Sequence, residues 1–176
     1  MSILYRELNL EELDMINMID RSEIIRSLYV YTDKGLIEKE VHYDLHGFPN
    51  DELRNIIDRQ KILKLEGGKI FGTFDNEMLI GVASIEKKIR GKKNKYCKMD
   101  ILHISSNYRK QGIASSLMNK CKEAARLFGA AKLYISSTES KNTVEFYLKR
   151  GAKLVEELDK ELYELEPEDI HLEMLI

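Results

Sequence analysis

Apolar residues recur with a helical period in some segments of the chain and with a strand period in others. The clearest helix lies between Gly112 and Gly129, because its apolar side chains repeat every three or four positions and so share one face. Residues typical of helix caps, Asn9, Asn50 and Asn142, predict the start of three further helices. Their expected ranges are residues 10–20, 51–66 and 143–150.

Segments with strand character follow the second of these helices. Residues 70–74 and 78–85 flank the turn Asp75-Asn76 and predict a hairpin, and residues 99–104 predict a third antiparallel strand. The remaining expected strands are residues 133–135, 152–158 and 170–176. Residues 21–48 keep no single period, so we expect extended or irregular structure there.

The order of these elements predicts the fold class. A strand, the helix after Gly112 and a second strand favour a right-handed parallel crossover within an otherwise antiparallel sheet. The expected fold is therefore α/β (α+β), with a mixed, mostly antiparallel sheet flanked by helices. At 176 residues, without a linker or an internal repeat, the chain is expected to form a single domain over residues 1–176.

Composition narrows the classes of function. The formal net charge is −2, so no global basic field attracts nucleic acid. Cys97 and Cys121 fit neither a zinc spacing nor a disulfide framework and are expected to be reduced packing residues. No signal peptide and no apolar run of membrane-spanning length is evident, so we expect a cytoplasmic protein with no membrane partner.

Charge is unevenly distributed along the chain. Six basic residues lie between Lys87 and Lys95, and eight acidic residues lie between Glu156 and Asp169. Runs of like charge are usually exposed to solvent, and we expect both to be solvated connections.

The most informative segment joins the strand at residues 99–104 to the helix after Gly112. Its sequence, Arg109-Lys110-Gln111-Gly112-Ile113-Ala114, places a glycine where the backbone turns into a helix whose first N–H groups have no partner. Such a helix start can hold phosphate, with Arg109 and Lys110 adding charge at the rim. On this geometry alone, the segment is equally compatible with a tightly packed helix start beside a solvated basic pair.

The fuller pattern resembles the GNAT superfamily of N-acetyltransferases. The superfamily signature is Arg or Gln, two residues, Gly, one residue, then Gly or Ala, and residues 109–114 fit every position. A later segment, Asn142 to Ala152, resembles the family's asparagine, Phe-Tyr pair and glycine, although Glu145 and Ala152 stand where the family more often has alanine and an aromatic residue.

The resemblance implies a fold, a cosubstrate and residues that bind it. It implies a GNAT fold in which two neighbouring parallel strands, here residues 99–104 and 133–135, splay apart around acetyl-CoA. The pyrophosphate would lie on the helix start, and backbone groups of Leu102 and Ile104 would pair with the pantetheine arm. Together with these two, the expected cosubstrate-binding residues are Arg109, Lys110, Gln111, Gly112, Ile113, Ala114, Ser115 and Asn142.

The chemistry of acetyl transfer requires an acid, and it uses a base where the amine arrives protonated. The resemblance assigns Tyr147 as the acid that protonates the leaving thiolate, and a half-buried aromatic residue is the alternative for this position. Strand alternation places Asp100 on the same face as Leu102 and Ile104, so Asp100 is a candidate base acting through water. Asp100 is equally compatible with a buried structural carboxylate, and His103 is expected to point the other way, into the core.

Residues His42, Asp44 and His46 alternate along the chain but do not make a metal site, because three alternate positions need a fourth ligand that no other cluster supplies. We expect no metal. His42, Tyr43 and Asp44 are instead expected to line or cover the acceptor pocket.

The sequence therefore predicts an acetyl-CoA-dependent N-acetyltransferase acting on a primary amine of a small molecule. The acidic run, at the connection between the closing strands, favours a cationic amine. A non-catalytic acyl-CoA binding or sensing module and a protein N-terminal or lysine acetyltransferase are the alternatives. An interaction domain, in which the basic and acidic runs pair between the subunits of a homodimer, is a further alternative.

Overall fold

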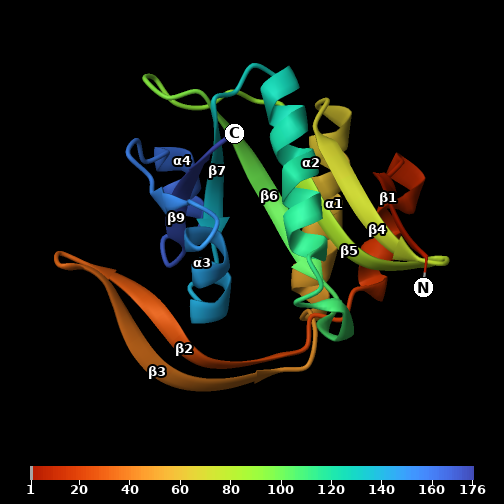
Figure 1. Cartoon of the computed structure of the whole chain (residues 1–176), viewed down its shortest axis with the longest axis horizontal. Helices are drawn as coiled ribbons and strands as arrows, with labels where there is room; N and C mark the ends of the chain where they lie inside the picture. The colour runs from red at the N-terminus through yellow and green to blue at the C-terminus, as the bar shows by residue number, and fades with distance from the viewer. Residues whose placement is uncertain (1) are drawn as a thin grey trace.

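The computed structural model describes residues 2–176 and contains one large sheet and one separate hairpin (Figure 1). The large sheet has seven strands in the order β1-β4-β5-β6-β7-β9-β8. Its strands are β1 (Ile3–Glu7), β4 (Lys69–Asp75), β5 (Met78–Ile85), β6 (Tyr96–Ile104), β7 (Lys132–Ser137), β8 (Lys153–Leu154) and β9 (Ile170–Leu175). The hairpin consists of β2 (Glu23–Thr32) and β3 (Gly35–Leu45).

Helices cover both faces of the large sheet (Figure 1). One apolar core packs α2 and α3 against the sheet, and a second packs α1 and η1 against the opposite face. Leu162 of α4 packs on Tyr96 and Tyr134 in a third, smaller cluster. The helical segments are η1 (Leu10–Met18), α1 (Asn50–Leu65), η2 (Ser106–Tyr108), α2 (Ile113–Leu127), α3 (Lys141–Leu148) and α4 (Lys160–Leu165).

Most of the predicted elements are confirmed, and the differences have local causes. Residues 10–18 form a 3-10 helix, and the Glu12 carboxylate accepts a hydrogen bond from the Asn9 backbone N–H at 2.8 Å, as a capping box requires. Helix α3 begins two residues earlier than predicted, because Ser140 rather than Asn142 caps it. The segment at residues 152–158 contributes only the two-residue strand β8, and α4 lies in what was expected to be a solvated loop.

Strands β6 and β7 form the one parallel pair of the sheet, and they separate partway along. Pairing runs from Tyr96 with Lys132 to Met99 with Ile135 and then stops. Beyond that point β6 stays paired with β5 as far as Ile104, and β7 stays paired with β9 as far as Ser137. A wedge therefore opens between the two strands at their carboxyl ends, as the predicted splayed pair requires.

A β-bulge lies on β6 inside this wedge. Ile85 pairs with Met99 and Ala83 with Leu102, so two steps along β5 face three steps along β6. The extra residue reverses the alternation of side chains on β6. Met99 packs in the core of α2, Ile101 packs in the core of α1, and Leu102 and Ile104 return to the α2 side.

The β2–β3 hairpin occupies the segment that was expected to be extended or irregular. Its strands pair from Glu23 with Leu45 to Thr32 with Gly35, with a bulge between Ile25 and Ser27. The arm runs beneath α3 (Figure 1), where the Tyr29 N–H donates to the Glu139 carbonyl at 2.8 Å. The hairpin thus bridges the two halves of the large sheet.

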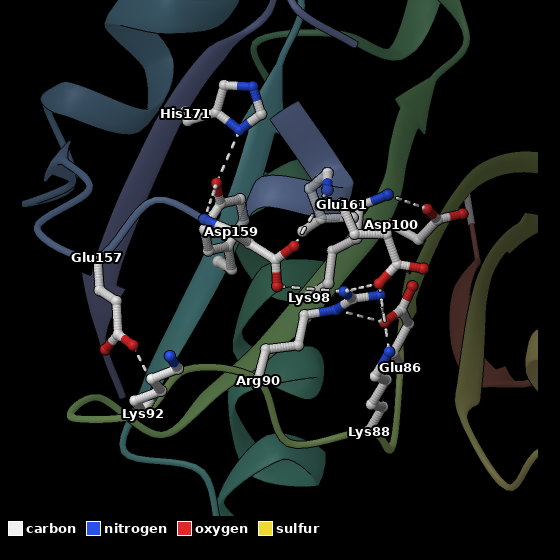
Figure 2. Close-up of polar contacts among 12 residues, drawn as sticks. Glu86, Lys88, Arg90, Lys92, Lys98, Asp100, Glu157, Asp159, Glu161 and His171 are labelled. Atoms are coloured by element: carbon white, nitrogen blue, oxygen red, sulfur yellow. Dashed lines mark hydrogen bonds and ion pairs between the residues drawn. The ribbon is translucent and has the colours of Figure 1, made fainter. Parts of the chain in front are cut away.

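Most side chains of the basic and acidic runs are exposed, as predicted, but parts of the two runs bind each other within the chain (Figure 2), so they are not only solvated connections. Arg90 is buried and binds Glu86 at 3.0 Å, Glu161 at 2.9 Å and Asp159 at 3.2 Å. The Glu157 carboxylate accepts hydrogen bonds from the backbone N–H groups of residues 92–94, which lower its pKa to about 2. These contacts hold α4 against the sheet.

Among residues 2–176, no helix is long and apolar enough to cross a membrane.

The Arg90 contacts predict a large and specific contribution to stability. Arg90→Met leaves the carboxylates of Glu86 and Asp159 with no cation, and we expect the free energy of unfolding to fall by about 2–4 kcal/mol. Urea denaturation at neutral pH measures this loss. Lys88→Met is the matched control, because Lys88 binds only the exposed Glu161 and should cost less than about 1 kcal/mol. Equal losses in the two variants would contradict the account.

Candidate active site

A single large cleft follows the wedge between β6 and β7 and continues across the sheet edge. Its volume is about 1330 Å³. On one side it is lined by the starts of α2 and α3, and on the other by α1 and by the corner between α4 and β9. The splayed strand ends form its floor, so both faces of the sheet contribute to one site.

The start of α2 presents free backbone donors to this cleft. The first intrahelical hydrogen bond runs from the Ser116 N–H to the Gly112 carbonyl at 3.1 Å, which leaves the N–H groups of Ile113, Ala114 and Ser115 unpaired by helix geometry. Gly112 has φ of 82°, a left-handed conformation that favours glycine, and no atom lies within 4 Å of the position a Cβ would take. The helix start therefore has the open space and the donors that a pyrophosphate needs.

Two predicted members of this site, Arg109 and Gln111, are engaged in other contacts, although Arg109 also lines the cleft. The Arg109 guanidinium donates to the Ile104 carbonyl at 3.1 Å and to the Ser22 carbonyl at 2.9 Å, so it ties β6 to the base of the hairpin and is not a free cation at the rim. The Gln111 side chain donates to the Asn107 carbonyl and does not line the cleft. Lys110, Ile113, Ala114, Ser115 and Asn142 do line it.

Arg150 is a cleft residue that sequence reasoning did not single out. Its Nε donates to the Ser115 hydroxyl at 2.9 Å, and its guanidinium lies 3.7 Å from the centre of the Phe146 ring. Its position after the Phe-Tyr pair of α3 was the available signal. Arg150 supplies a positive charge beside the free N–H groups of α2, where the sequence had placed Arg109.

Tyr147 lies on α3 and faces the cleft from within the α2 core. Only 6% of its surface is exposed, and burial raises its pKa above the ordinary value for tyrosine. Among residues 2–176 we find no hydrogen-bond partner for its hydroxyl. At neutral pH the phenol is therefore protonated and has a proton to donate.

Asp100 does not share a face with Leu102 and Ile104, so that prediction is wrong. The bulge on β6 turns its carboxylate toward α1, where it accepts hydrogen bonds from Arg59 at 2.7 Å, Gln60 at 2.6 Å and Lys98 at 2.7 Å. Burial alone would raise the pKa of Asp100, but the charges and hydrogen bonds of Lys98 and Arg59 lower it to about 2. A carboxylate held in this way is a weak proton acceptor and a good structural anchor.

His103 is half-buried and lines the cleft, so it is not a residue of the core as predicted, and its ring packs edge-on against Phe48 with a centroid distance of 5.1 Å. Burial, reinforced by the nearby guanidinium groups of Arg21 and Arg59, lowers its pKa to about 3. His103 is therefore neutral at physiological pH.

The segment that was expected to cover the acceptor pocket lies away from the cleft. His42, Tyr43 and Asp44 are exposed on β3 and none of them lines the cleft. The acceptor side is formed instead by the base of β2, by α1 and by the α4–β9 corner. Its charged residues are Arg21, Glu23, Glu52, Arg59, Glu166 and Asp169.

Comparisons with known proteins agree with this architecture. The model of the Acetyltransferase (GNAT) family matches residues 35–152, about two thirds of the chain. A nourseothricin acetyltransferase structure has a TM-score of 0.72 at 20% identity, covering 99% of each chain. The PaiA N-acetyltransferase of Thermoplasma acidophilum, in complex with coenzyme A, has a TM-score of 0.65 at 17% identity over 100% of both chains. An acetyltransferase from Streptococcus agalactiae 2603 has a TM-score of 0.65 at 16% identity, covering 99% of this chain and 98% of the other. A comparison with curated proteins finds no match.

At these identities the structural likeness shows the fold, and it confirms the expected mixed sheet with one splayed parallel pair. The match of the family model over most of the chain includes residues 109–114 and the Phe-Tyr segment of α3. The chain belongs to the GNAT family of acetyltransferases.

Proposed function

We propose that this protein transfers the acetyl group of acetyl-CoA to a primary amine of a small molecule by direct attack. The observation that carries this proposal is the coincidence of an open strand wedge with a helix start whose N–H groups are free. The wedge exposes backbone of residues 100–104 to an extended pantetheine arm, and the helix start offers donors to the pyrophosphate. Arg150 and Lys110 add positive charge beside it.

Tyr147 is the proposed acid for the leaving thiolate. Its phenol is protonated at neutral pH, it faces the cleft, and no group in the described part of the chain competes for its proton. The phenol keeps its proton until the C–S bond breaks and a thiolate forms as the proton acceptor. Asp100, in this proposal, fixes the bulge of β6 against α1 and does not move protons.

The acceptor side of the cleft supports a cationic amine. Arg21 is paired with Glu52 at 2.8 Å, and Arg59 shares the Asp100 carboxylate with Lys98, each at 2.7 Å. Glu166 and Asp169 line the same side and form no salt bridge with any residue from 2 to 176. The uncompensated charge next to the acceptor is therefore negative, which attracts ammonium groups.

The phosphate site predicts a charge-specific effect at Gly112. Gly112→Asp places a carboxylate against the phosphates, and we expect the affinity for coenzyme A to fall more than tenfold, about 1.4 kcal/mol. Gly112→Asn is the matched control, because asparagine has the same size and tolerates the left-handed conformation without adding charge. Titration calorimetry on the folded variants measures both affinities. Unchanged affinity in Gly112→Asp rules out this helix start as the phosphate site.

If Tyr147 is the acid, removing its hydroxyl should lower turnover and leave the binding of coenzyme A unchanged. We expect Tyr147→Phe to lower kcat by about 10²-fold or more, while the affinity for coenzyme A changes little. Steady-state release of coenzyme A measures kcat, and thermal denaturation checks that the variant is folded. Tyr163→Phe, on the exposed side of α4, is the control and should keep the parental rate. A Tyr147→Phe enzyme within a factor of about two of the parent assigns the proton to solvent.

The charge of the acceptor side predicts a ranking of substrates. Spermidine and putrescine should give higher kcat/KM values than amines without a second positive charge, and their advantage should shrink as salt screens the carboxylates. Initial rates at low and high salt test this, with a lysine-containing peptide and a free amino acid in the same panel. A preference for the peptide, or equal rates with no salt dependence, would contradict a small cationic acceptor.

A further inference from the structure

The corner between α4 and β9 is held rigidly against the acceptor side of the cleft. The Nε2–H of His171 donates to the Glu166 carbonyl at 3.2 Å, and its Nδ1 accepts from the Tyr134 hydroxyl at 2.8 Å. The partners fix this tautomer, because a carbonyl oxygen can only accept. The Asp169 N–H also donates to the Glu166 carbonyl at 3.2 Å, and Ile170 then enters β9 opposite Ser137. The side chains of Glu166 and Asp169 are therefore presented by a fixed backbone.

Asp169 differs from most of the other acidic residues of its run. Five of these are bound by cations or backbone donors of the fold: Glu156, Glu157, Asp159, Glu161 and Glu164. Asp169 is half-buried, lines the cleft and has no salt-bridge partner among residues 2–176. The charged groups that face it are Glu166, Glu139 on the β7–α3 connection, and Lys98 on β6. Lys98 is itself bound to Asp100 at 2.7 Å.

A second observation at the same place indicates a polar ligand. The hydroxyl oxygen of Ser136 is buried and has no hydrogen-bond partner in the described part of the chain. Ser136 lines the cleft and lies opposite His171 in the β7–β9 register, two residues from Asp169 along β9. A buried hydroxyl without a partner is costly, so a ligand that hydrogen-bonds to it would stabilise this part of the site.

Asp100 and Asp169, the two carboxyl groups compared as the base, differ in their capacity to accept a proton. Asp100 is held by three donors and its pKa is about 2. Burial, followed by the negative charge and hydrogen bond of Glu166, raises the pKa of Asp169 to about 7. A general base is most effective when its pKa lies near the working pH. Asp169 meets this condition and Asp100 does not.

We propose that Asp169 is the catalytic residue that takes the proton from the attacking ammonium group, with Glu166 beside it to hold the positive charge of the acceptor. This inference rests on the proposed function. Asp169 accepts one proton from R–NH3⁺, and the freed electron pair of the nitrogen forms the C–N bond to the thioester carbonyl. The C–S bond breaks with its electrons on sulfur, and the thiolate takes the proton of Tyr147. The nitrogen, positively charged after the attack, loses a second proton, which reprotonates the Tyr147 phenolate through solvent. The proton held by Asp169 then leaves to solvent and restores the carboxylate. One proton is released overall.

The pH dependence of kcat/KM tests this role, with the best amine of the panel as acceptor. In the parent enzyme kcat/KM should rise with pH through about 7, because only the deprotonated carboxylate accepts a proton; this rise is the acidic limb of the pH profile. Asp169→Asn should lower kcat/KM at pH 8 by about 10²-fold or more and remove this limb, with coenzyme A affinity unchanged. Glu166→Gln should move the limb to lower pH, because it removes a neighbouring negative charge. The control Glu168→Gln, exposed and outside the cleft, should match the parent.

An Asp169→Asn enzyme that keeps the limb, or stays within a factor of about two of the parent rate, overturns the proposal while leaving acetyl transfer itself intact. A second readout needs no acceptor. In a carbon-13 NMR titration, the side-chain carboxyl carbon of Asp169 should titrate near pH 7 in the parent and lower in Glu166→Gln. A midpoint near 4, the ordinary value for aspartate, overturns the proposal. Failure of every amine to release coenzyme A is a separate outcome, and it counts against the proposed function.

Discussion

The separation of β6 and β7 beyond Met99 and Ile135 is the constraint on which the rest of the site depends. Backbone N–H and C=O groups inside a sheet are almost always paired, and ending a ladder in mid-sheet leaves several of them open. The fold keeps each strand in place from its outer side, by β5 for β6 and by β9 for β7. Arg109 adds a further restraint by binding the Ile104 carbonyl at the end of β6. The gap is thus a fixed slot for an extended ligand with its own hydrogen-bonding groups.

The bulge on β6 separates the two faces of this slot chemically. It sends Leu102 and Ile104 toward α2 and α3, where the core is apolar, and Asp100 toward α1, where Arg59, Gln60 and Lys98 surround it. The α2 side therefore suits the apolar stem and phosphates of a thioester cosubstrate, with donors at the helix start. The α1 side suits a polar acceptor, with its compensated arginines and the uncompensated corner at Glu166 and Asp169. One inserted residue thus gives the two sides of the slot different chemistry, as the proposed reaction requires.

The parts of this arrangement that depend on local sequence were predicted. Gly112 and the apolar period after it are local signals, and they predicted α2 and a helix start with free N–H groups. The parts that depend on contacts between distant residues were not. The direction of Asp100 follows from the β5–β6 register, and the pairing of Arg90 with Asp159 and Glu161 joins residues about 70 positions apart. Helix α4 did leave a local signal that was missed, because Leu158, Leu162 and Leu165 have helical spacing within the acidic run.

Hydrogen–deuterium exchange at the start of α2 tests the central claim most directly. The N–H groups of Ile113, Ala114 and Ser115 have no partner among residues 2–176, so they should exchange rapidly in the free protein. If the wedge holds acetyl-CoA with its pyrophosphate on this helix start, adding acetyl-CoA should slow exchange at these three positions and along residues 100–104 of β6. Binding of acetyl-CoA with unchanged exchange at residues 113–115 would contradict the account, because the phosphates would then lie elsewhere.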